Sequence, residues 1–184
     1  MPPSGNTVSS RLGREDIPRD VLNDSISFVS QDTALIAGTV RDNLTLWNPT
    51  VPDPQLIAAA RDAAIHEEIM ARAHGYDAEV EEWGRNFSGG QRQRVEIARA
   101  LVPGPSLLIL DEATGALDAI TESRIDDALR RRGCSCLIVA HRLSTIRDCD
   151  RIVVLDGGRA VQDGVHDRLV AVEDGLYREL VHAS

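Results

Sequence analysis

Three short apolar runs, each followed at once by polar side chains, constrain the fold of this 184-residue chain most strongly. The runs cover residues 25–30, 107–110 and 136–140. The first alternates and is rich in β-formers, whereas the other two are continuous, as is typical of strands buried on both faces. Helical segments separate the runs. The sequence therefore predicts an α/β fold with a parallel sheet covered by helices on both faces.

The remaining segments have clear start and stop signals. Asp53 followed by Pro54 suits a helix start, and Gly133 suits a helix end. The predicted helices span residues 54–73, 91–101 and 121–132, with a helical tail at 164–184. A β-hairpin is predicted over residues 151–162 because two β-rich runs flank Asp-Gly-Gly. Residues 1–20, 39–46 and 78–86 are predicted to be irregular.

Charge and composition exclude several classes of protein. The 29 acidic and 20 basic residues give a net charge of -9, which disfavours nucleic-acid binding because phosphates need a basic face. The first ten residues lack the charged and apolar blocks of a signal peptide, and no apolar run approaches the ~20 residues that span a bilayer. We expect a cytoplasmic protein, held at the inner face of the membrane only through a partner. The three cysteines (Cys134, Cys136 and Cys149) have no disulfide or zinc framework, which fits a reducing compartment. Cys134 and Cys136, at the start of a predicted strand, are expected to be buried thiols.

The residues that follow the three apolar runs form a candidate site. Gln31 follows the first run, Asp111 and Glu112 the second, and His141 the third. In parallel sheets, ligands bind beyond the carboxyl ends of the strands. Asp111 can hold Mg²⁺, and Glu112 can orient or deprotonate an attacking water. Each residue alone is explained as readily by an ordinary loop, but their placement at successive strand tips favours a phosphate site.

A fourth element is the segment Ser88-Gly89-Gly90-Gln91 at a helix start. The glycines leave backbone N–H groups unobstructed, and the helix dipole favours an anion there. A serine-capped helix with a glycine-rich entry is also common without a ligand. Together with the strand tips, however, it predicts a site for a polyphosphate.

These motifs resemble those of ATP-binding-cassette (ABC) proteins. NFSGGQRQRVEIARAL (residues 86–101) resembles the signature motif, and LLILDEATGALD (107–118) the Walker B strand with its catalytic glutamate and D-loop. LIVAHRLSTI (137–146) is similar to the His switch, and FVSQD (28–32) to the Q-loop. The tract at residues 38–53 is similar to the exporter type, and the wording of the motifs is most similar to the ATPase components of NHLM-type bacteriocin or peptide exporters.

The resemblance implies a fold, partners and residue roles. It implies a P-loop NTPase-like sheet with a helical signature subdomain at about residues 38–100, and a RecA-like core with a C-terminal tail at about 21–37 and 101–184. It implies ATP and Mg²⁺ as cofactors, a transmembrane permease domain, and a second nucleotide-binding domain in a head-to-tail dimer. The segment at residues 78–84 lies where exporters read the transmembrane domain. The implied roles are as follows: Asp111 and Gln31 for Mg²⁺, Glu112 as general base, His141 and Gln31 as γ-phosphate sensors, Ser88, Gly89, Gly90 and Gln91 for the opposite subunit's γ-phosphate, and Asp118 for contact across the dimer.

One departure from the family pattern bears on activity. The phosphate cradle G-x-x-x-x-G-K-[ST] does not occur in the chain, and all 20 basic residues are arginine, so no lysine can replace it. Charge-assisted phosphate contacts contribute roughly 1.5–3 kcal/mol each, so losing several weakens binding by orders of magnitude. We therefore expect a partial ABC ATPase domain, without its N-terminal β-subdomain and P-loop, that alone neither binds ATP tightly nor hydrolyses it. A smaller departure is Gly115, where the family usually has Ser.

Two other functions are compatible with the motifs. The chain could be a non-catalytic interaction module that offers its signature motif to an intact ABC partner. The ABC relatives of chromosome-maintenance and DNA-repair proteins are the second alternative. In those proteins a long coiled coil separates the Q-loop lobe from the signature lobe, whereas here Gln31 and Ser88 lie in one compact, acidic chain.

Overall fold

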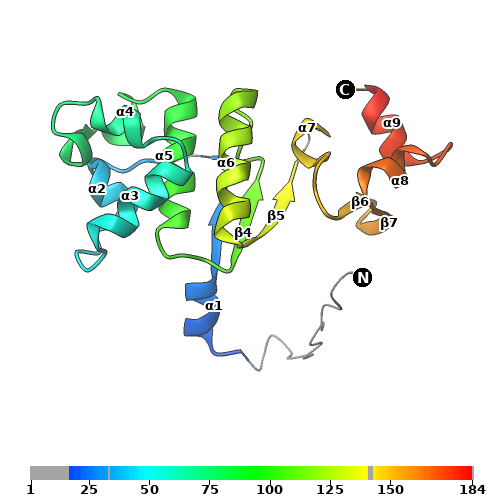
Figure 1. Cartoon of the computed structure of the whole chain (residues 1–184), viewed down its shortest axis with the longest axis horizontal. Helices are drawn as coiled ribbons and strands as arrows, with labels where there is room; N and C mark the ends of the chain where they lie inside the picture. The colour runs from blue at the N-terminus through cyan, green and yellow to red at the C-terminus, as the bar shows by residue number, and fades with distance from the viewer. Residues whose placement is uncertain (1–16, 33, 141–142, 184) are drawn as a thin grey trace, which may run out of the picture.

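A computed structural model of the chain describes residues 17–32, 34–140 and 143–183 (Figure 1). Its main sheet has three strands in the order β1-β4-β5, all parallel. They are β1 (Ile26–Val29), β4 (Leu107–Asp111) and β5 (Ser135–Val139). The register pairs Phe28 with Ile109 and Ile109 with Leu137. The predicted parallel sheet is therefore confirmed, with the second apolar run as its central strand.

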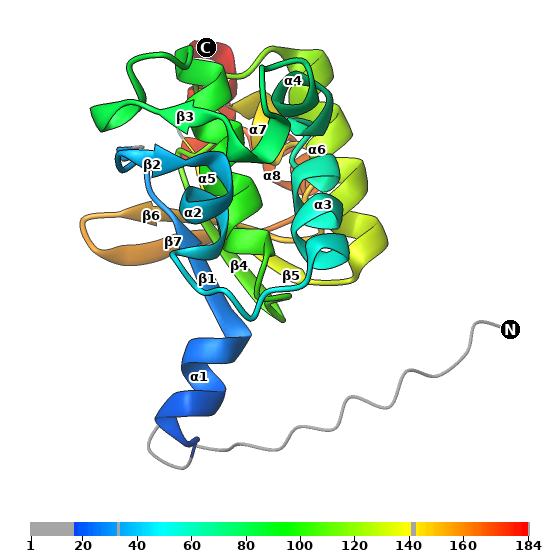
Figure 2. The ribbon, with the colours of Figure 1, turned by 90° about the vertical axis from the view of Figure 1, so that its left-hand side faces the viewer.

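One face of this sheet is covered by helices. Val29 and Leu108 point into this face and are fully buried. They belong to the same core as Leu101 of α5 (Gly89–Leu101) and Ile125 of α6 (Ala119–Arg132). Figure 2 shows these helices above the strands. Burying such side chains contributes roughly 1.5–3 kcal/mol each, so this face holds the main core together.

The other face of the sheet is open, which corrects the prediction of strands buried on both faces. Phe28, Leu137 and Val139 are 55%, 54% and 47% exposed. Side chains alternate along a strand, so the residues of each strand that do not enter the core line this second face. Among the described residues no helix packs on it, and β5 is an edge strand. The apolar run at residues 136–140 therefore reads like a buried strand but is largely exposed.

A helical region lies between β1 and β4. Its elements are α2 (Val40–Thr45), α3 (Asp53–Asp62), α4 (His66–Met70) and α5, a ladder of β2 (Gly38–Thr39) with β3 (Glu79–Val80), and the 3₁₀ turns η2 (Gly75–Asp77) and η3 (Glu82–Gly84). The prediction of an irregular segment was wrong for residues 39–46, which contain α2, whereas residues 78–86 are irregular outside β3 and η3. Thr39 and Asp42 form a capping box that starts α2, with Asp42 N–H donating to Thr39 Oγ1 at 3.0 Å.

The helix predicted over residues 54–73 is broken in two. Ala64, between α3 and α4, has a left-handed conformation with φ of 53°. Its neighbour Ile65 donates a backbone hydrogen bond to Ala60 and is fully buried. The break therefore turns the chain so that Ile65 and Ile69 of α4 enter the core beside α3.

The C-terminal part has a small core of its own. This C-terminal part contains α7 (Leu143–Ile146), β6 (Ile152–Asp156), β7 (Arg159–Gly164), α8 (His166–Val170) and α9 (Leu176–Ala183). At the other end of the chain, α1 (Arg19–Ser25) precedes β1. The predicted hairpin is confirmed as β6 and β7, which pair antiparallel. Tyr177 and Leu169 pack against Ile152 and Val154 of the hairpin. The predicted helical tail consists of the two short helices α8 and α9. No helix in the described part of the chain is long and apolar enough to cross a membrane.

Candidate functional site

The carboxyl ends of β1, β4 and β5 meet at one edge of the sheet. Val29, the last residue of β1, pairs with Leu110, and Asp111, the last residue of β4, pairs with Val139. Gln31 follows β1, and Glu112 follows β4, so both lie beyond the same edge as Asp111. His141 lies outside the described residues. The expectation that these strand tips share an edge is therefore confirmed for Gln31, Asp111 and Glu112, while their chemical roles remain predictions.

Glu112 has an uncommon backbone conformation at this edge. Its φ of 50° lies in the left-handed region, which is strained for a side chain of this kind. Its N–H donates to the Val139 carbonyl at 2.9 Å, and its own carbonyl accepts from the N–H of Gly115 at 3.2 Å. Neighbouring backbone on two sides thus fixes the turn that carries the carboxylate. Strain that is held in this way is common at functional sites.

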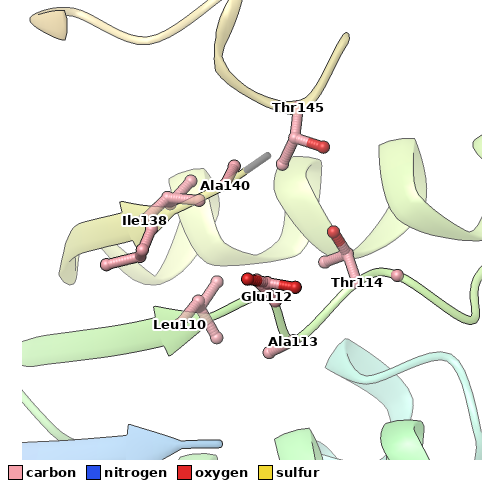
Figure 3. Close-up of a pocket in the computed structure, with 9 residues that line it drawn as sticks. Leu110, Glu112, Ala113, Thr114, Ile138, Ala140 and Thr145 are labelled. Carbon is pink, nitrogen blue, oxygen red and sulfur yellow. The ribbon is translucent and has the colours of Figure 1, made fainter. Parts of the chain in front are cut away.

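A pocket of about 210 Å³ opens beside Glu112 (Figure 3). It lies between the ends of β4 and β5, and its wall includes Leu110, Ile138, Thr114 and Thr145. Asp111 and Gln31 do not line it. Asp111 continues the row of Leu107 and Ile109 on the open face of the sheet, because alternate residues of a strand share a face. Asp111 therefore lies on the open face of the sheet, whereas its neighbour Glu112 lines the pocket.

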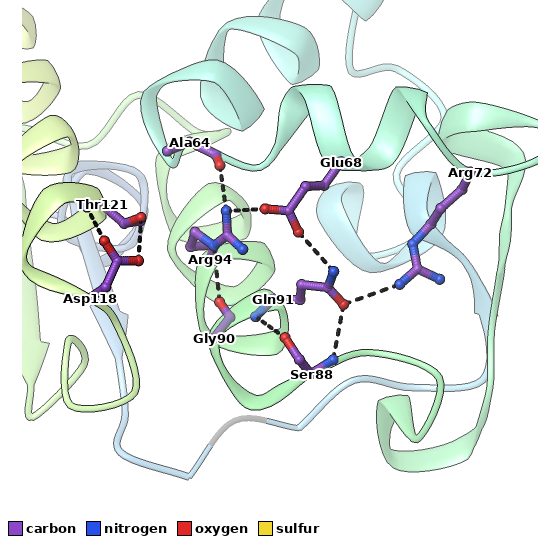
Figure 4. Close-up of polar contacts among 9 residues, drawn as sticks. All are labelled: Ala64, Glu68, Arg72, Ser88, Gly90, Gln91, Arg94, Asp118 and Thr121. Atoms are coloured by element: carbon purple, nitrogen blue, oxygen red, sulfur yellow. Dashed lines mark hydrogen bonds and ion pairs between the residues drawn. The ribbon is translucent and has the colours of Figure 1, made fainter.

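The helix start at Ser88 is built as the sequence predicts. Ser88 is the N-cap of α5, and its Oγ accepts a hydrogen bond from the N–H of Gln91 at 3.2 Å. Gln91 Oε1 accepts in return from the N–H of Ser88 at 2.9 Å, which completes a capping box (Figure 4). The hydroxyl proton of Ser88 remains available to donate, because Oγ acts as an acceptor in this box. Gly89 and Gly90 form the first turn of the helix.

The side chain of Gln91, which is expected to be a phosphate ligand, makes hydrogen bonds within the protein. Gln91 Nε2 donates to Glu68 Oε2 at 2.7 Å, and Oε1 also accepts from Arg72 Nη2 at 3.3 Å (Figure 4). Arg72 stacks over the ring of Phe87 at 3.5 Å from its centroid and donates to the Asn86 carbonyl. Gln91 thus ties the start of α5 to α4 and to the segment before Ser88.

Glu68 and Arg94 complete this network. Arg94 Nη1 lies 2.7 Å from Glu68 Oε1 and donates to the Ala64 carbonyl at 2.7 Å. Burial pushes the pKa of Glu68 upward, but hydrogen bonds from Arg94 and Gln91 and the charges of Arg94 and Arg72 outweigh it. The pKa of Glu68 therefore lies below its usual value of 4.5. Neither Glu68 nor Arg94 was predicted, because they lie on different helices and no local signal pairs them.

The beginning of α5 is in direct contact with the loop that follows β4. Gln93 of α5 is almost fully buried, and its Oε1 accepts a hydrogen bond from the N–H of Ala116 at 3.0 Å. Ala116 lies in the loop that begins at Glu112 and ends at α6. At the far end of this loop, Asp118 caps α6 by accepting from the N–H of Thr121 at 3.0 Å and from its hydroxyl at 2.7 Å (Figure 4). These bonds hold the pKa of the exposed Asp118 below its usual value.

The chain is similar in sequence and in structure to proteins of one known family. The family profile described as ABC transporter matches residues 3–115. The chain belongs to the ABC transporter family. Its sheet and helices form an ABC ATPase fold, as the sequence predicts. A solved structure titled as a bacterial Atm1-family ABC exporter with ATP bound superposes with a TM-score of 0.85 at 40% identity, over 91% of this chain and 30% of that chain.

Curated relatives agree with this family. An uncharacterized ABC transporter ATP-binding protein of Sinorhizobium fredii is 42% identical over 181 residues, which is 97% of this chain and 31% of that protein. A protein of Staphylococcus aureus, provisionally named a multidrug export ATP-binding/permease protein, is 46% identical over 179 residues, covering 96% of this chain and 31% of its own length. The chain thus spans about a third of the length of these ABC relatives.

The donors at the sheet edge fit the Mg²⁺ that ABC ATPases typically use. Within the described ranges, no group of three or more His, Cys, Asp or Glu residues could hold a metal ion by itself. Mg²⁺ is usually bound by one or two protein oxygens together with phosphate oxygens and water. Asp111 and Gln31 provide hard oxygen donors of this kind at one edge. They fit an ion that arrives with a nucleotide rather than a dedicated metal cage.

The cysteines of this ABC chain are less buried than expected. Cys136 is exposed, and Cys134 and Cys149 are half-buried. Cys136 lies on β5, and the edge position of that strand explains its exposure. The prediction of buried thiols was therefore wrong for Cys136.

Proposed function

We propose that this chain is a portion of the ATP-binding domain of an ABC exporter, which couples ATP binding and hydrolysis to transport. The observation that carries the proposal is the contact between two halves of the candidate site. The Ser88-capped helix packs, through Gln93 and Ala116, on the loop that holds Glu112 in its strained conformation. The likeness to an exporter with ATP bound, and the relatives named for export, support the same conclusion.

Within this proposal each residue has a defined task. Glu112 orients or deprotonates the attacking water, His141 and Gln31 sense the γ-phosphate, and Asp111 with Gln31 holds Mg²⁺. Mg²⁺, when bound, neutralises charge on the phosphates. Ser88, Gly89 and Gly90 donate hydrogen bonds to the γ-phosphate of ATP held by a second domain. Asp118 contacts that domain across the head-to-tail dimer.

Gln91 has an indirect task in this scheme. Its two side-chain ends are hydrogen-bonded to Ser88, Arg72 and Glu68. It positions the Ser88 hydroxyl and the glycine N–H groups rather than contacting phosphate with its own amide.

The permease is proposed to meet the helical region. We assign residues 38–100 to a signature subdomain, and residues 21–37 and 101–184 to the core with its C-terminal tail. The exposed Trp83, at 65%, lies in η3 within the segment that exporters use to read the transmembrane domain. Burying an aromatic of this size in an interface is a common source of binding energy. Contact with a permease would hold the domain at the cytoplasmic face of the membrane.

The transported substrate is proposed to be a peptide of the bacteriocin type. Support comes only from the amino-acid sequences of the signature and His-switch motifs, which are most similar to those of the NHLM group. The Staphylococcus aureus relative is named for multidrug export instead, so the peptide assignment separates this chain from that relative.

The 184 residues are proposed not to hold ATP tightly by themselves. A nucleotide needs a phosphate cradle with its lysine, and the chain contains neither. Positioning dominates phosphoryl transfer, so Glu112 cannot act on phosphates that nothing holds in place.

Mixing experiments test the proposed function. The chain is added to an intact ABC exporter ATP-binding domain, and ATP hydrolysis is measured. We expect stimulation that Ser88→Arg abolishes, because arginine blocks the helix start. Asp127→Arg places the same side chain on an exposed position of α6 and should leave the stimulation unchanged. Absence of stimulation, or equal stimulation by the Ser88→Arg variant, would contradict the proposal.

A second candidate is a non-catalytic module that regulates an intact ABC partner by offering its signature motif. The absence of lysine from a chain that keeps Ser88, Gly89 and Gly90 favours this candidate. The mixing experiment separates the two, since a regulatory module of this kind would inhibit hydrolysis by the partner through the same Ser88-dependent contact.

A further inference from the structure

Glu122 of α6 joins two segments that border the pocket. Its Oε1 accepts a hydrogen bond from Thr114 Oγ1 at 2.8 Å and another from Thr145 Oγ1 at 2.9 Å. Thr114 lies in the loop that begins at Glu112, whereas Thr145 lies in α7, beyond β5. A single carboxylate oxygen therefore links the segments that follow two neighbouring strands.

Both threonines line the pocket that opens beside Glu112, and Figure 3 shows Thr145 above Thr114 in that view. Glu122 is half-buried and is not part of the pocket wall. Hydrogen bonds to a carboxylate are shorter and stronger than those between neutral groups. The link can therefore fix the separation of the two walls without occupying the space between them.

The loop on one side of this link is strained. Glu112 has a left-handed backbone conformation. Backbone hydrogen bonds from the N–H of Gly115 to the Glu112 carbonyl and from the N–H of Leu117 to the Thr114 carbonyl close the turns that follow it. A strained residue keeps its conformation only where the surrounding structure over-determines it. The bond from Thr114 to Glu122 adds a side-chain restraint to these backbone bonds.

We propose that Glu122 is a positioning residue whose carboxylate holds the Glu112 loop and α7 at a fixed separation and so sets the width of the pocket. The inference rests on the proposed function only where it treats Glu112 as the base. The tether itself concerns the free chain and needs no nucleotide, so its test is independent of ATP binding.

Amide hydrogen exchange of the full chain, followed by NMR, tests the tether. Three amides report on the two sides: Gly115 and Leu117 in the loop, and Cys149, which donates to the Ile146 carbonyl at the end of α7. Glu122→Ala should accelerate exchange at all three by about tenfold or more, since it removes two hydrogen bonds to a charged group.

Two variants serve as controls in this experiment. Glu122→Gln keeps an acceptor oxygen in place and should restore most of the protection. Asp127→Asn removes an exposed carboxylate from the same helix and should leave all three amides unchanged. Equal effects of Glu122→Gln and Glu122→Ala would contradict the hydrogen-bonded tether.

The threonines provide a second test that survives even if Glu122→Ala does not fold. Thr145→Val should accelerate exchange at Leu117, and Thr114→Val should accelerate exchange at Cys149, although each change lies on the opposite side. The two effects should be non-additive in the double variant, because both bonds end on one oxygen. Effects confined to the mutated side, or strict additivity, would overturn the inference.

Discussion

Gly90 of α5 lies directly against Ala116 of the loop between β4 and α6. A Cβ placed on Gly90 would stand 3.1 Å from the Ala116 carbonyl oxygen, which is backbone and cannot rotate away. Gly89, one residue earlier, has only ordinary contact, with the Ala116 Cβ at 3.9 Å from such an atom. Packing between the two halves of the site is thus tight at the second glycine and leaves room for a Cβ at the first.

This contact predicts different outcomes for two alanine substitutions. Gly89→Ala should leave the free energy of unfolding unchanged or raise it by up to about 1 kcal/mol, since alanine favours helix. Gly90→Ala should be less stable than Gly89→Ala by about 1–3 kcal/mol, because the added methyl overpacks the contact. Urea denaturation of both variants measures the difference. Equal stability of the two variants would show that the loop at Ala116 yields freely.

The network around Glu68 predicts a pH dependence. Because the folded-state pKa of Glu68 is lowered, its contribution to stability is present above its unfolded pKa and is lost as the pH falls through the folded value. Glu68→Gln should therefore be less stable than wild type at neutral pH, and the difference should shrink as the pH falls from about 6 to 3. The side chain is 41% exposed, so the difference should not exceed about 1 kcal/mol.

Denaturation midpoints across this pH range measure the effect. Glu67→Gln removes an exposed carboxylate from the same first turn of α4 and serves as the control for the loss of a negative charge there. A gap between wild type and Glu68→Gln that widens on acidification would mean that the ion pair with Arg94 does not favour the charged form.

The open face of the sheet predicts self-association of the 184-residue chain. Phe28, Leu137 and Val139 form an exposed apolar surface next to the edge of β5 that pairs with no strand among the described residues. Unpaired edges and apolar patches of this kind promote association. We expect the double variant Phe28→Thr/Leu137→Thr to self-associate less than wild type. Ile120→Thr, which changes an exposed apolar residue at the start of α6, serves as the control.

Sedimentation velocity at several protein concentrations tests this prediction. Wild type and Ile120→Thr should both shift to larger species with concentration, and the double variant should shift less. A wild-type chain that stays monomeric at all concentrations would mean that the open face does not drive self-association.

Local sequence signals predicted much of the sheet and of the helix start. The apolar runs located β1, β4 and β5, and the glycines after Ser88 located α5. The start of α2 was missed although Thr39 and Asp42 have the spacing of a capping box. The break at Ala64 was missed for a different reason, because alanine carries no local signal for a left-handed conformation.

The remaining errors concern contacts between distant segments. Whether residues 136–140 are buried depends on which elements cover β5. The same apolar sequence occurs in a covered strand and in an uncovered one, so it does not distinguish them. Likewise, the bonds of Gln91 to Glu68, and of Glu122 to Thr145, join residues from different elements. Periodicity and capping rules describe neighbours along the chain, so they cannot identify such partners.

The central claim is that this chain contributes to a nucleotide site without building a phosphate cradle of its own. Isothermal titration of Mg-ATP into the purified 184-residue chain tests it most directly. We expect no saturable binding in the micromolar range, because no lysine and no P-loop hold the phosphates. A micromolar dissociation constant for the chain alone would contradict it.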